Sequence, residues 1–416
     1  MTKPIDSQIQ SMQDLVPVLS RSEGFAAVVA ALQSGQSGTI DGAWGGSCAL
    51  AAATIAASLK SPVLIVLPRL GEIDEFSGDL ASFLGTAPEI FPAWETLPNE
   101  HDVADSVFGG RLRVLNQLMQ TEQNTDSHPQ VIVTSFPALL QPVPSRQKRR
   151  EATRTIRVGD EIETDPFMNW LIERGFERTT AIELPGEFSM HGGILDIFSP
   201  DASLPIRIEF FGDEVESIRQ FDVETQRTVA TCEQIDLTLI SPVSAAAPHS
   251  PHRPQTRDLD QTASESLLDN LPAETCIVLI ELPELIDEGK RYLDRLENPR
   301  GLFSVPATMS RCTDFPSVTI APISAESTEI SCHLQIESIE RFTRAKSEMI
   351  EELASITGPH DRVIVCCHNQ GEQDRLQEIL AESALEITGR VTTCIGNLAL
   401  GFRIVPEHLV VLSDHE

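Results

Sequence analysis

The stretch from Gly186 to Val229 constrains the fold of this chain more than any other. Within it, Ile206-Arg207-Ile208-Glu209-Phe210 alternates apolar and polar side chains. Successive side chains of a strand point to opposite faces, so this period of two predicts strands with one buried face. Tight turns are expected at Ser199-Pro200-Asp201 and at Phe211-Gly212-Asp213-Glu214. Gly192-Gly193 indicates a bulge or a close approach of two backbones. The residues alone predict a twisted antiparallel sheet.

The same stretch carries a family resemblance. The segments GEF-x₃-GGILDIF and PIRIEFFGDEVESIR-x-FD-x₂-TQR are similar to the inserted β-rich domain shared by UvrB and the transcription-repair coupling factor (Mfd) family. The resemblance implies that this domain docks on UvrA, the damage-recognition ATPase of nucleotide excision repair.

The resemblance also implies which residues face UvrA, because the family surface includes arginines and apolar residues around the glycine pair. Carried over by position, it assigns Phe188, Ile194 and Leu195 to that surface. His191 stands where the family usually has an arginine, and Arg178 lies beside a second such position. Histidine is mostly neutral at pH 7, so the charge pattern departs from that of the family, and His191 can also be read as an ordinary exposed strand residue. Nine acidic residues against three arginines in the stretch favour a basic partner face.

A second motif lies near the N-terminus, where a short strand at 39–41 is followed by a glycine-rich turn and a helix expected at 50–59. That layout is typical of a phosphate-binding loop, in which backbone N–H groups and the helix N-terminus bind phosphate. In the pattern GxxGxGK(S/T), however, the lysine position is Cys48 and the hydroxyl position is Ala49. Gly42, Gly45 and Gly46, with Cys48 and Ala49, are therefore predicted to form a degenerate nucleotide loop without a working site.

The surrounding segments point to the coupling factors and away from UvrB. FPAWETLP and GGRLRVL resemble the first domain of the coupling factors, whereas UvrB keeps an intact phosphate loop. PVLIVLP at 62–68 reads as a buried parallel strand. No DExx box follows the next strand, at 131–144, so the acid that would hold Mg²⁺ is also expected to be missing.

These patterns predict an α/β multidomain protein. Residues 1–145 are the first part of a degenerate helicase-like (P-loop-type) parallel α/β domain, and residues 146–245 are the inserted antiparallel β-rich UvrA-binding domain. Residues 246–335 complete the first domain, and 336–416 form a small α/β domain. The basic run at 145–157 is expected to be a solvated connector, 241–265 a linker, and 308–322 a strand pair.

Composition excludes several classes of function. The net charge of -31 argues against direct DNA binding, because phosphate contacts rest on Lys and Arg. No apolar run reaches the length of a membrane span, and the N-terminus has no signal-peptide pattern. Eight scattered cysteines without CxxC spacing, and His249 and His252 without further ligands, predict no metal site. We expect a cytoplasmic protein with reduced thiols.

One catalytic alternative is a thiol enzyme built on Cys366 or Cys367 with His368 and Asp374. Both cysteines end an apolar strand, and the spacing sets no base beside them, so buried thiols are expected instead.

The resemblance as a whole implies the N-terminal, repair-recruiting portion of a transcription-repair coupling factor, since the sequence stops at Glu416 where the family continues. The partner expected of this chain is UvrA. In the family, RNA polymerase and double-stranded DNA bind through domains absent here, and ATP and Mg²⁺ belong to the absent translocase motor, so no cofactor and no catalytic residue are expected. The alternative is a UvrB-like ATPase subunit, which would need lysine at 48 and a hydroxyl at 49.

Overall fold

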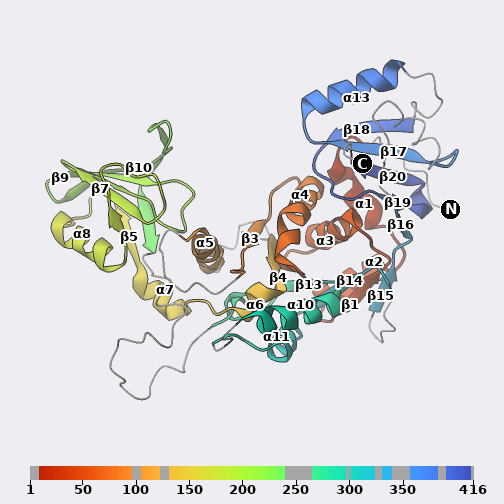
Figure 1. Ribbon diagram of the computed structural model, residues 1–416, viewed down its shortest axis with the longest axis horizontal. Coiled ribbons are helices and arrows are strands. Elements are labelled where there is room, and N and C mark those ends of the chain that lie inside the picture. The colour runs from red at the N-terminus through yellow and green to blue at the C-terminus, as the bar shows by residue number, and fades with distance from the viewer. Residues whose placement is uncertain are drawn as a thin grey trace.

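The computed structural model describes residues 9–95, 105–121, 131–238, 265–296, 299, 301–323, 330–339, 357–382 and 390–413. In Figure 1 an antiparallel β-rich body lies to one side of a parallel sheet with its helices, and a smaller α/β body lies above that sheet. The segments at 122–130, 239–264 and 340–356 lie outside the described residues, and the second of them contains all but the last residue of the expected linker.

A seven-stranded sheet in which every pair is parallel forms the largest unit. Runs of apolar residues such as Val63–Leu67 and Cys276–Ile280 become strands buried on both faces, as a covered parallel sheet requires. Its strands, in spatial order, are β15 (Ile330–His333), β1 (Gly38–Asp41), β14 (Ser317–Ala321), β13 (Cys276–Ile280), β2 (Val63–Leu67), β4 (Val131–Ser135) and β3 (Glu89–Phe91).

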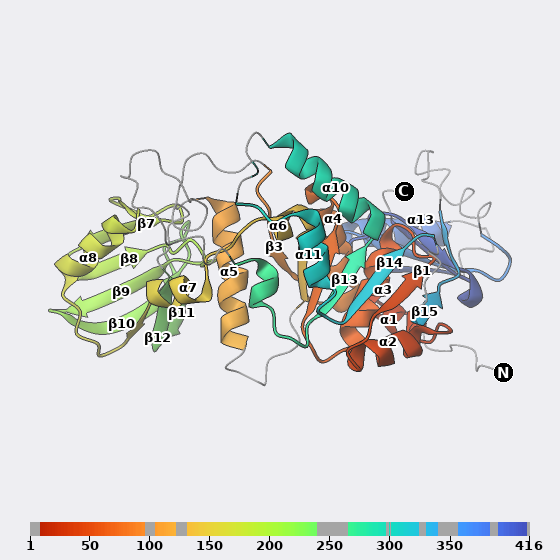
Figure 2. The same cartoon turned by 90° about the horizontal axis from the view of Figure 1, so that it is seen from below.

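Helices cover both faces of this sheet (Figure 2), and each face has its own apolar cluster. On one face lie α1 (Leu15–Leu19), α2 (Phe25–Gln33), α3 (Gly46–Ser58) and α4 (Ile73–Leu84). On the other lie α5 (Ser106–Thr121), α6 (Phe136–Leu140), α10 (Leu282–Arg295) and α11 (Val305–Cys312). The expected strand pair at 308–322 is wrong in part, because its first residues belong to α11 and only its second half is a strand, β14.

The segments FPAWETLP and GGRLRVL meet in this unit. Arg111 of α5 is buried with its guanidinium 4.4 Å from the ring centroid of Phe91 and 4.7 Å from that of Trp94. It donates hydrogen bonds to the Pro92 carbonyl (2.9 Å) and to Gln141 Oε1 (3.0 Å). Burial lowers the pKa of Arg111 to about 9. These two segments therefore encode packing between α5 and the β3 exit.

The basic run at 145–157 is only in part the solvated connector that its composition suggested, because Lys148, Arg150, Arg154 and Arg157 are exposed but the run forms regular elements. It forms α7 (Arg146–Ala152) and β5 (Thr153–Arg157), and Arg149 is fully buried. Its guanidinium donates to the Leu115 carbonyl (2.6 Å) and to Asn270 Oδ1. A buried cation must have such acceptors, and local charge counting cannot reveal them because they come from distant segments.

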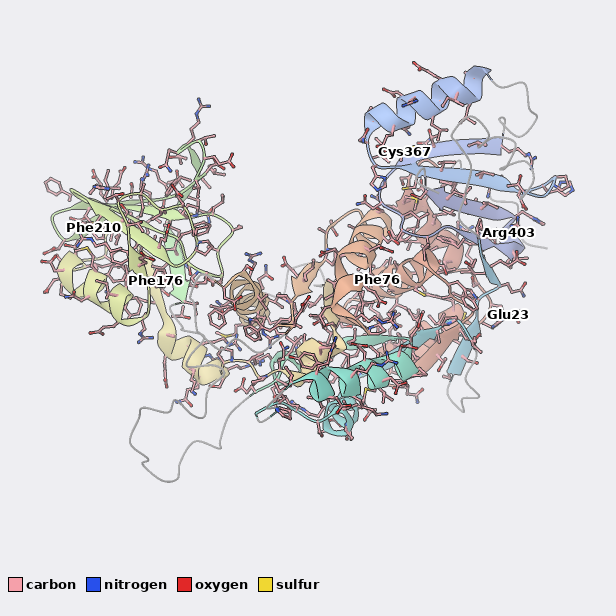
Figure 3. The ribbon with its side chains drawn as sticks, viewed as in Figure 1. Glu23, Phe76, Phe176, Phe210, Cys367 and Arg403 are labelled. Carbon is pink, nitrogen blue, oxygen red and sulfur yellow. The ribbon has the colours of Figure 1, made fainter. Side chains whose placement is uncertain are left out.

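The β-rich body is a six-stranded sheet whose inner face packs on α8 (Thr164–Glu173) and on the β5–β12 ribbon. Its order is β11 (Thr228–Cys232), β10 (Glu214–Phe221), β9 (Ile206–Phe211), β8 (Ile194–Ile197), β7 (Glu187–His191) and β6 (Glu177–Arg178), and β12 spans Gln234–Thr238. All pairs are antiparallel except β6–β7. Figure 3 labels Phe176 and Phe210, two of its core side chains.

The third unit is a mixed five-stranded sheet with one described helix, α13 (Gln370–Glu382). Its order is β16 (Ile336–Ser338), β19 (Phe402–Ile404), β20 (Leu409–Ser413), β17 (Arg362–Cys367) and β18 (Val391–Ile395). Side chains from β17, β19 and β20 belong to the same apolar cluster as α1 and α3. In Figure 3 this unit, with Cys367 and Arg403, lies over α4 and its Phe76.

Candidate functional site

The face of the six-stranded sheet that points away from α8 is the candidate interaction surface, and we call it the outer face. Strand alternation and register assign to it the following residues: Ser189, His191, Ile194, Asp196, Arg207, Glu209, Phe211, Ser217 and Arg219. Their neighbours along each strand, such as Leu195, Ile208 and Ile218, point into the core. The outer face is therefore mainly polar where the inner face is apolar, although Phe221 is buried on it in a small apolar cluster with Ile182 and Phe198, and Ser189 is buried as well.

Two cross-strand ion pairs order the middle of the outer face. Arg207 donates to both carboxylate oxygens of Asp196 at 2.8 Å, and its guanidinium lies 4.3 Å from the ring centroid of Phe221. Arg219 donates to Glu209 at 2.8 Å, and Ser217 donates to the same carboxylate at 2.8 Å. The Asp196 hydrogen bonds and charge raise the pKa of Arg207. These fixed pairs leave little net charge in the centre of the surface.

One end of the outer face is apolar and exposed. Phe211 is 79% exposed at the tight β9–β10 turn, and Ile194 is 39% exposed at the start of β8. The register places them on neighbouring strands, since Ile194 pairs with Glu209 and Phe210 N donates to the Gly193 carbonyl at 2.7 Å. An exposed aromatic beside an exposed aliphatic side chain is the kind of anchor that protein interfaces use.

The glycine pair makes this end possible. A Cβ on Gly193 would lie 2.7 Å from the Phe210 carbonyl oxygen, so no larger residue fits there without a shift. Gly192 has φ +61° with open space around it, a conformation that favours glycine. The predicted close backbone approach is confirmed, and it brings β8 and β9 together at their exposed end.

The structure corrects the assignment of Phe188 and Leu195 to the partner surface. Both side chains are fully buried in the core cluster of the β-rich body. Met190 pairs with Leu195 and Phe188 with Ile197, and these pairs face inward. They can support the surface from beneath, but neither can touch a partner while the domain is folded.

The other three assigned residues are exposed. Arg178 lies on the edge strand β6, His191 at the end of β7 and Ile194 on β8, so three successive strands carry them. A ring nitrogen of His191 contacts the Thr180 carbonyl oxygen, which holds the imidazole against the segment that follows β6. Phe211 was not assigned from the sequence, although its place in a hairpin turn beside alternating residues was a usable signal.

The outer face is held relative to α5 by a polar contact. Asn116 Nδ2 donates to Asp201 Oδ2 at 2.8 Å, and Arg113 Nε donates to the Asp201 carbonyl at 3.1 Å. A Cβ on Gly109 would lie 2.2 Å from the Pro200 carbonyl oxygen, so the helix approaches the predicted 199–201 turn directly. Burial raises the pKa of Asp201, although the Ser199 hydroxyl and Asn116 oppose this. Figure 2 shows α5 standing between the β-rich body and the parallel sheet.

The glycine loop lies between β1 and α3, as the sequence predicts, but α3 begins at Gly46 and not at residue 50. Cys48 and Ala49 are buried in its first turn. Burial, followed by the Glu281 carboxylate, raises the pKa of Cys48 to about 12. Neither residue supplies a cation or a hydroxyl to the loop.

Glu281 is an acid that sequence reasoning missed. It follows β13 directly, two strands along the sheet from β1, and it has φ 54° and ψ 64° in the left-handed region. Burial raises its pKa most, followed by Glu72 and Glu284, while Arg69 lowers it. Its charge acts on Cys48 beside the loop, but the residue after it is Leu282, so Glu281 does not belong to a DExx box.

The thiol-enzyme alternative finds no support in the described part of the chain. Cys366 and Cys367 are both buried. A hydrogen bond with Cys394, followed by burial, raises the pKa of Cys366, which disfavours the reactive thiolate. Among the described residues no group of three His, Cys, Asp or Glu side chains could hold a metal ion. No described helix is both long and apolar enough to span a bilayer.

Comparison with known proteins first defines a class. Residues 155–242 match the family model of the UvrB interaction domain. These residues form β5, α8 and the whole six-stranded sheet with β12. The chain is thus a protein that carries a UvrB interaction domain.

The full-length relatives are more specific. The chain is 38% identical over 173 residues to the transcription-repair-coupling factor of Mycobacterium bovis, covering 41% of this chain and 14% of that protein. It is 30% identical over 280 residues to that of Myxococcus xanthus (64% and 22%) and 28% identical over 229 residues to that of Bacillus subtilis (54% and 19%). The chain is therefore related to a part of the transcription-repair coupling factors, and it matches less than a quarter of their length. The resemblance to the transcription-repair coupling factors that the sequence indicated is confirmed.

Proposed function

We propose that this chain is the N-terminal, repair-recruiting module of a transcription-repair coupling factor, and that it binds UvrA through the outer face of its six-stranded sheet. The observation that carries the proposal is the UvrB interaction domain match, which covers that sheet. The module would bring nucleotide excision repair to stalled RNA polymerase in the cytoplasm. Polymerase and DNA would be contacted by parts of the relatives that this chain does not match.

The apolar end of the outer face supports this proposal. Phe211 and Ile194 are exposed on adjacent strands, with His191 paired to Ile194 beside them. Aromatic and aliphatic anchors of this kind carry most of the binding energy in interfaces, while the ion-paired centre adds specificity. The acidic excess of the chain complements a basic partner face.

The helicase-like interpretation of the parallel sheet also belongs to this proposal. A parallel sheet with a glycine loop after β1 supports it, and the lack of lysine at 48 supports a module without ATP hydrolysis. On this proposal ATP and Mg²⁺ are not cofactors of this chain. The UvrB-like ATPase alternative has no favourable observation at Cys48 or Ala49.

Calorimetric titration of the purified chain with its cognate UvrA tests the proposal. The double variant Ile194→Ala/Phe211→Ala should weaken binding by about 2 kcal/mol or more, roughly thirtyfold, because truncated anchors cost this much. The matched control is Ile172→Ala, since Ile172 is 51% exposed on α8, which packs on the opposite face of the sheet.

Equal loss in the double variant and in Ile172→Ala would show that the outer face is not the contact. No binding by the parent chain at tens of micromolar would refute the recruiting role. Because both substituted side chains are exposed, circular dichroism should show unchanged folding, and a binding loss can then be assigned to the surface.

A further inference from the structure

The glycine loop is covered by a segment of the small α/β unit. The Gly46 amide donates to the Leu400 carbonyl at 3.2 Å. From the same segment, the Ala399 amide donates to Asp79 Oδ1 at 2.9 Å and the Asn397 amide donates to Ser82 Oγ at 2.7 Å. We call these contacts between residues 396–400 and the loop with α4 the seam. The Leu400 carbonyl thus accepts from the Gly46 amide, a donor that a bound phosphate would need.

The two glycines fit the seam sterically. A Cβ on Gly46 would lie 2.5 Å from Leu398 Cδ1 and 2.7 Å from the Leu400 carbonyl oxygen. A Cβ on Gly45 would lie 2.8 Å from Leu400 Cβ. Leu398 itself is only 3% exposed. Because Gly45 and Gly46 have no side chains, Leu398 and Leu400 can pack directly against the loop.

Three further amides of the loop also donate to acceptors within the protein. The Trp44 amide donates to Ser47 Oγ at 2.7 Å, and the amides of Ser47 and Cys48 donate to the carbonyls of Trp44 and Gly45 at 3.0 and 3.1 Å. A phosphate-binding loop works because several amides point at the anion together. Here four amides between Trp44 and Cys48 already have protein acceptors.

The local charge opposes a polyphosphate. Asp79 is buried, and its Oδ2 lies 3.4 Å from where a Gly46 Cβ would stand, next to the N-terminus of α3. The Glu281 carboxylate acts on Cys48 from the β13 side. The hollow beside the seam, about 290 Å³, is lined by Asp74, Glu75 and Asp79 together with His368. Carboxylates in these places repel phosphate. They also interact favourably with the positive N-terminal end of the α3 dipole, which would otherwise attract an anion.

We infer that the glycine loop is a binding site for a peptide segment of its own chain: residues 396–400 occupy it, join the small α/β unit to α3 and α4, and exclude nucleotide. This inference goes beyond UvrA recruitment and does not depend on it. It gives the degenerate loop a structural role, because its glycines and the Gly46 amide at the start of α3 hold the segment in place.

Hydrogen exchange of the full chain, followed by mass spectrometry, tests this inference. Gly46→Ala places a methyl group against Leu398 and Leu400, while in a free helix alanine would be favourable. We expect amide exchange in the 392–404 peptide to rise by about tenfold or more. The control is Gly71→Ala, because nothing lies within 4 Å of a Cβ at Gly71.

A second variant covers the case in which Gly46→Ala fails to fold. Ser82→Ala removes the acceptor of the Asn397 amide, together with the bond that the Ser82 hydroxyl donates to the Gly78 carbonyl within α4. Exchange should therefore rise at Asn397 while the β9 and β10 peptides stay as protected as before. Adding millimolar MgATP to the parent chain should leave the 42–50 and 392–404 peptides unchanged.

Equal exchange in Gly46→Ala and Gly71→Ala would overturn the inference. Protection of the 42–50 peptide by MgATP would overturn it as well, because the loop would then be open to nucleotide. Neither result would bear on UvrA binding, which is measured on a different surface.

Discussion

The glycine loop and the outer face of the six-stranded sheet are opposite cases. The loop has a motif that is associated with ligand binding, yet four of its amides between Trp44 and Cys48 donate to protein acceptors, and Leu398 and Leu400 lie against Gly45 and Gly46. The outer face has no ligand motif, yet it leaves Phe211 79% exposed. The difference shows that the geometry of a motif makes a ligand site only if the hydrogen-bond donors of the motif are still available to a ligand.

The largest expected effect separates the two faces of the β-rich sheet. Phe188→Ala should destabilise that body by about 3–5 kcal/mol, because it leaves a cavity in the core. Phe211→Ala should change stability by less than about 0.5 kcal/mol, because the ring is in solvent. Urea unfolding, followed by hydrogen exchange of the β9 and β10 peptides, measures both. Equal costs would mean that the outer face is itself part of a packed core.

A smaller effect tests the contact that holds the outer face against α5. Burial raises the pKa of Asp201 from its ordinary 3.8, so the folded state keeps a proton that the unfolded state has lost above that pH. Its contribution to stability is therefore present below 3.8 and is lost as pH rises through the native pKa. Asp201→Asn cannot ionise and still accepts from Asn116, so its stability relative to the parent should rise from about pH 4 to about pH 7.

Asp222→Asn is the control of opposite sign. Hydrogen bonds from Thr225 lower the pKa of Asp222, so the parent gains relative to this variant as pH rises. Urea midpoints measured across the same pH range give both trends. A flat difference for Asp201→Asn would show that water reaches the α5 contact.

The smallest perturbation compares thiols in the two regions. Cys232 lies on β11 of the β-rich sheet and is partly exposed, whereas the other seven cysteines are buried, including Cys48 beside the glycine loop. Because burial raises the pKa of Cys48 to about 12, almost no thiolate forms there at about pH 8. Brief iodoacetamide treatment should modify Cys232 first, as mass spectrometry would show. Comparable labelling of Cys48 would indicate that the seam opens readily.

Much of the fold follows from local patterns. Apolar runs predict β2 and β13, alternation predicts β9, and the glycine pair predicts the close approach at Gly193. Alternation also argues against one assignment that was made from the family resemblance. Ile194 and Leu195 are successive strand residues, so they could not both face a partner.

The rest depends on contacts between segments far apart in the sequence. Gly46 meets Leu400, and Arg149 finds Leu115 and Asn270, none of which a local window can pair. Glu281 follows β13, which comes after the β-rich body in the sequence but lies in the same sheet as β1. Sequence patterns predict elements, whereas occupancy of a site is decided by tertiary packing.

The small α/β unit has a mechanical consequence. β20 is hydrogen-bonded on both edges, parallel to β17 and antiparallel to β19. Tension applied along the backbone at Ser413 would pull across these bonds and load them in shear. Many bonds must then break together, so forced unfolding would be slow. Leu409 and Val411 share an apolar cluster with Leu398 and α3, so the load would pass into the glycine-loop helix.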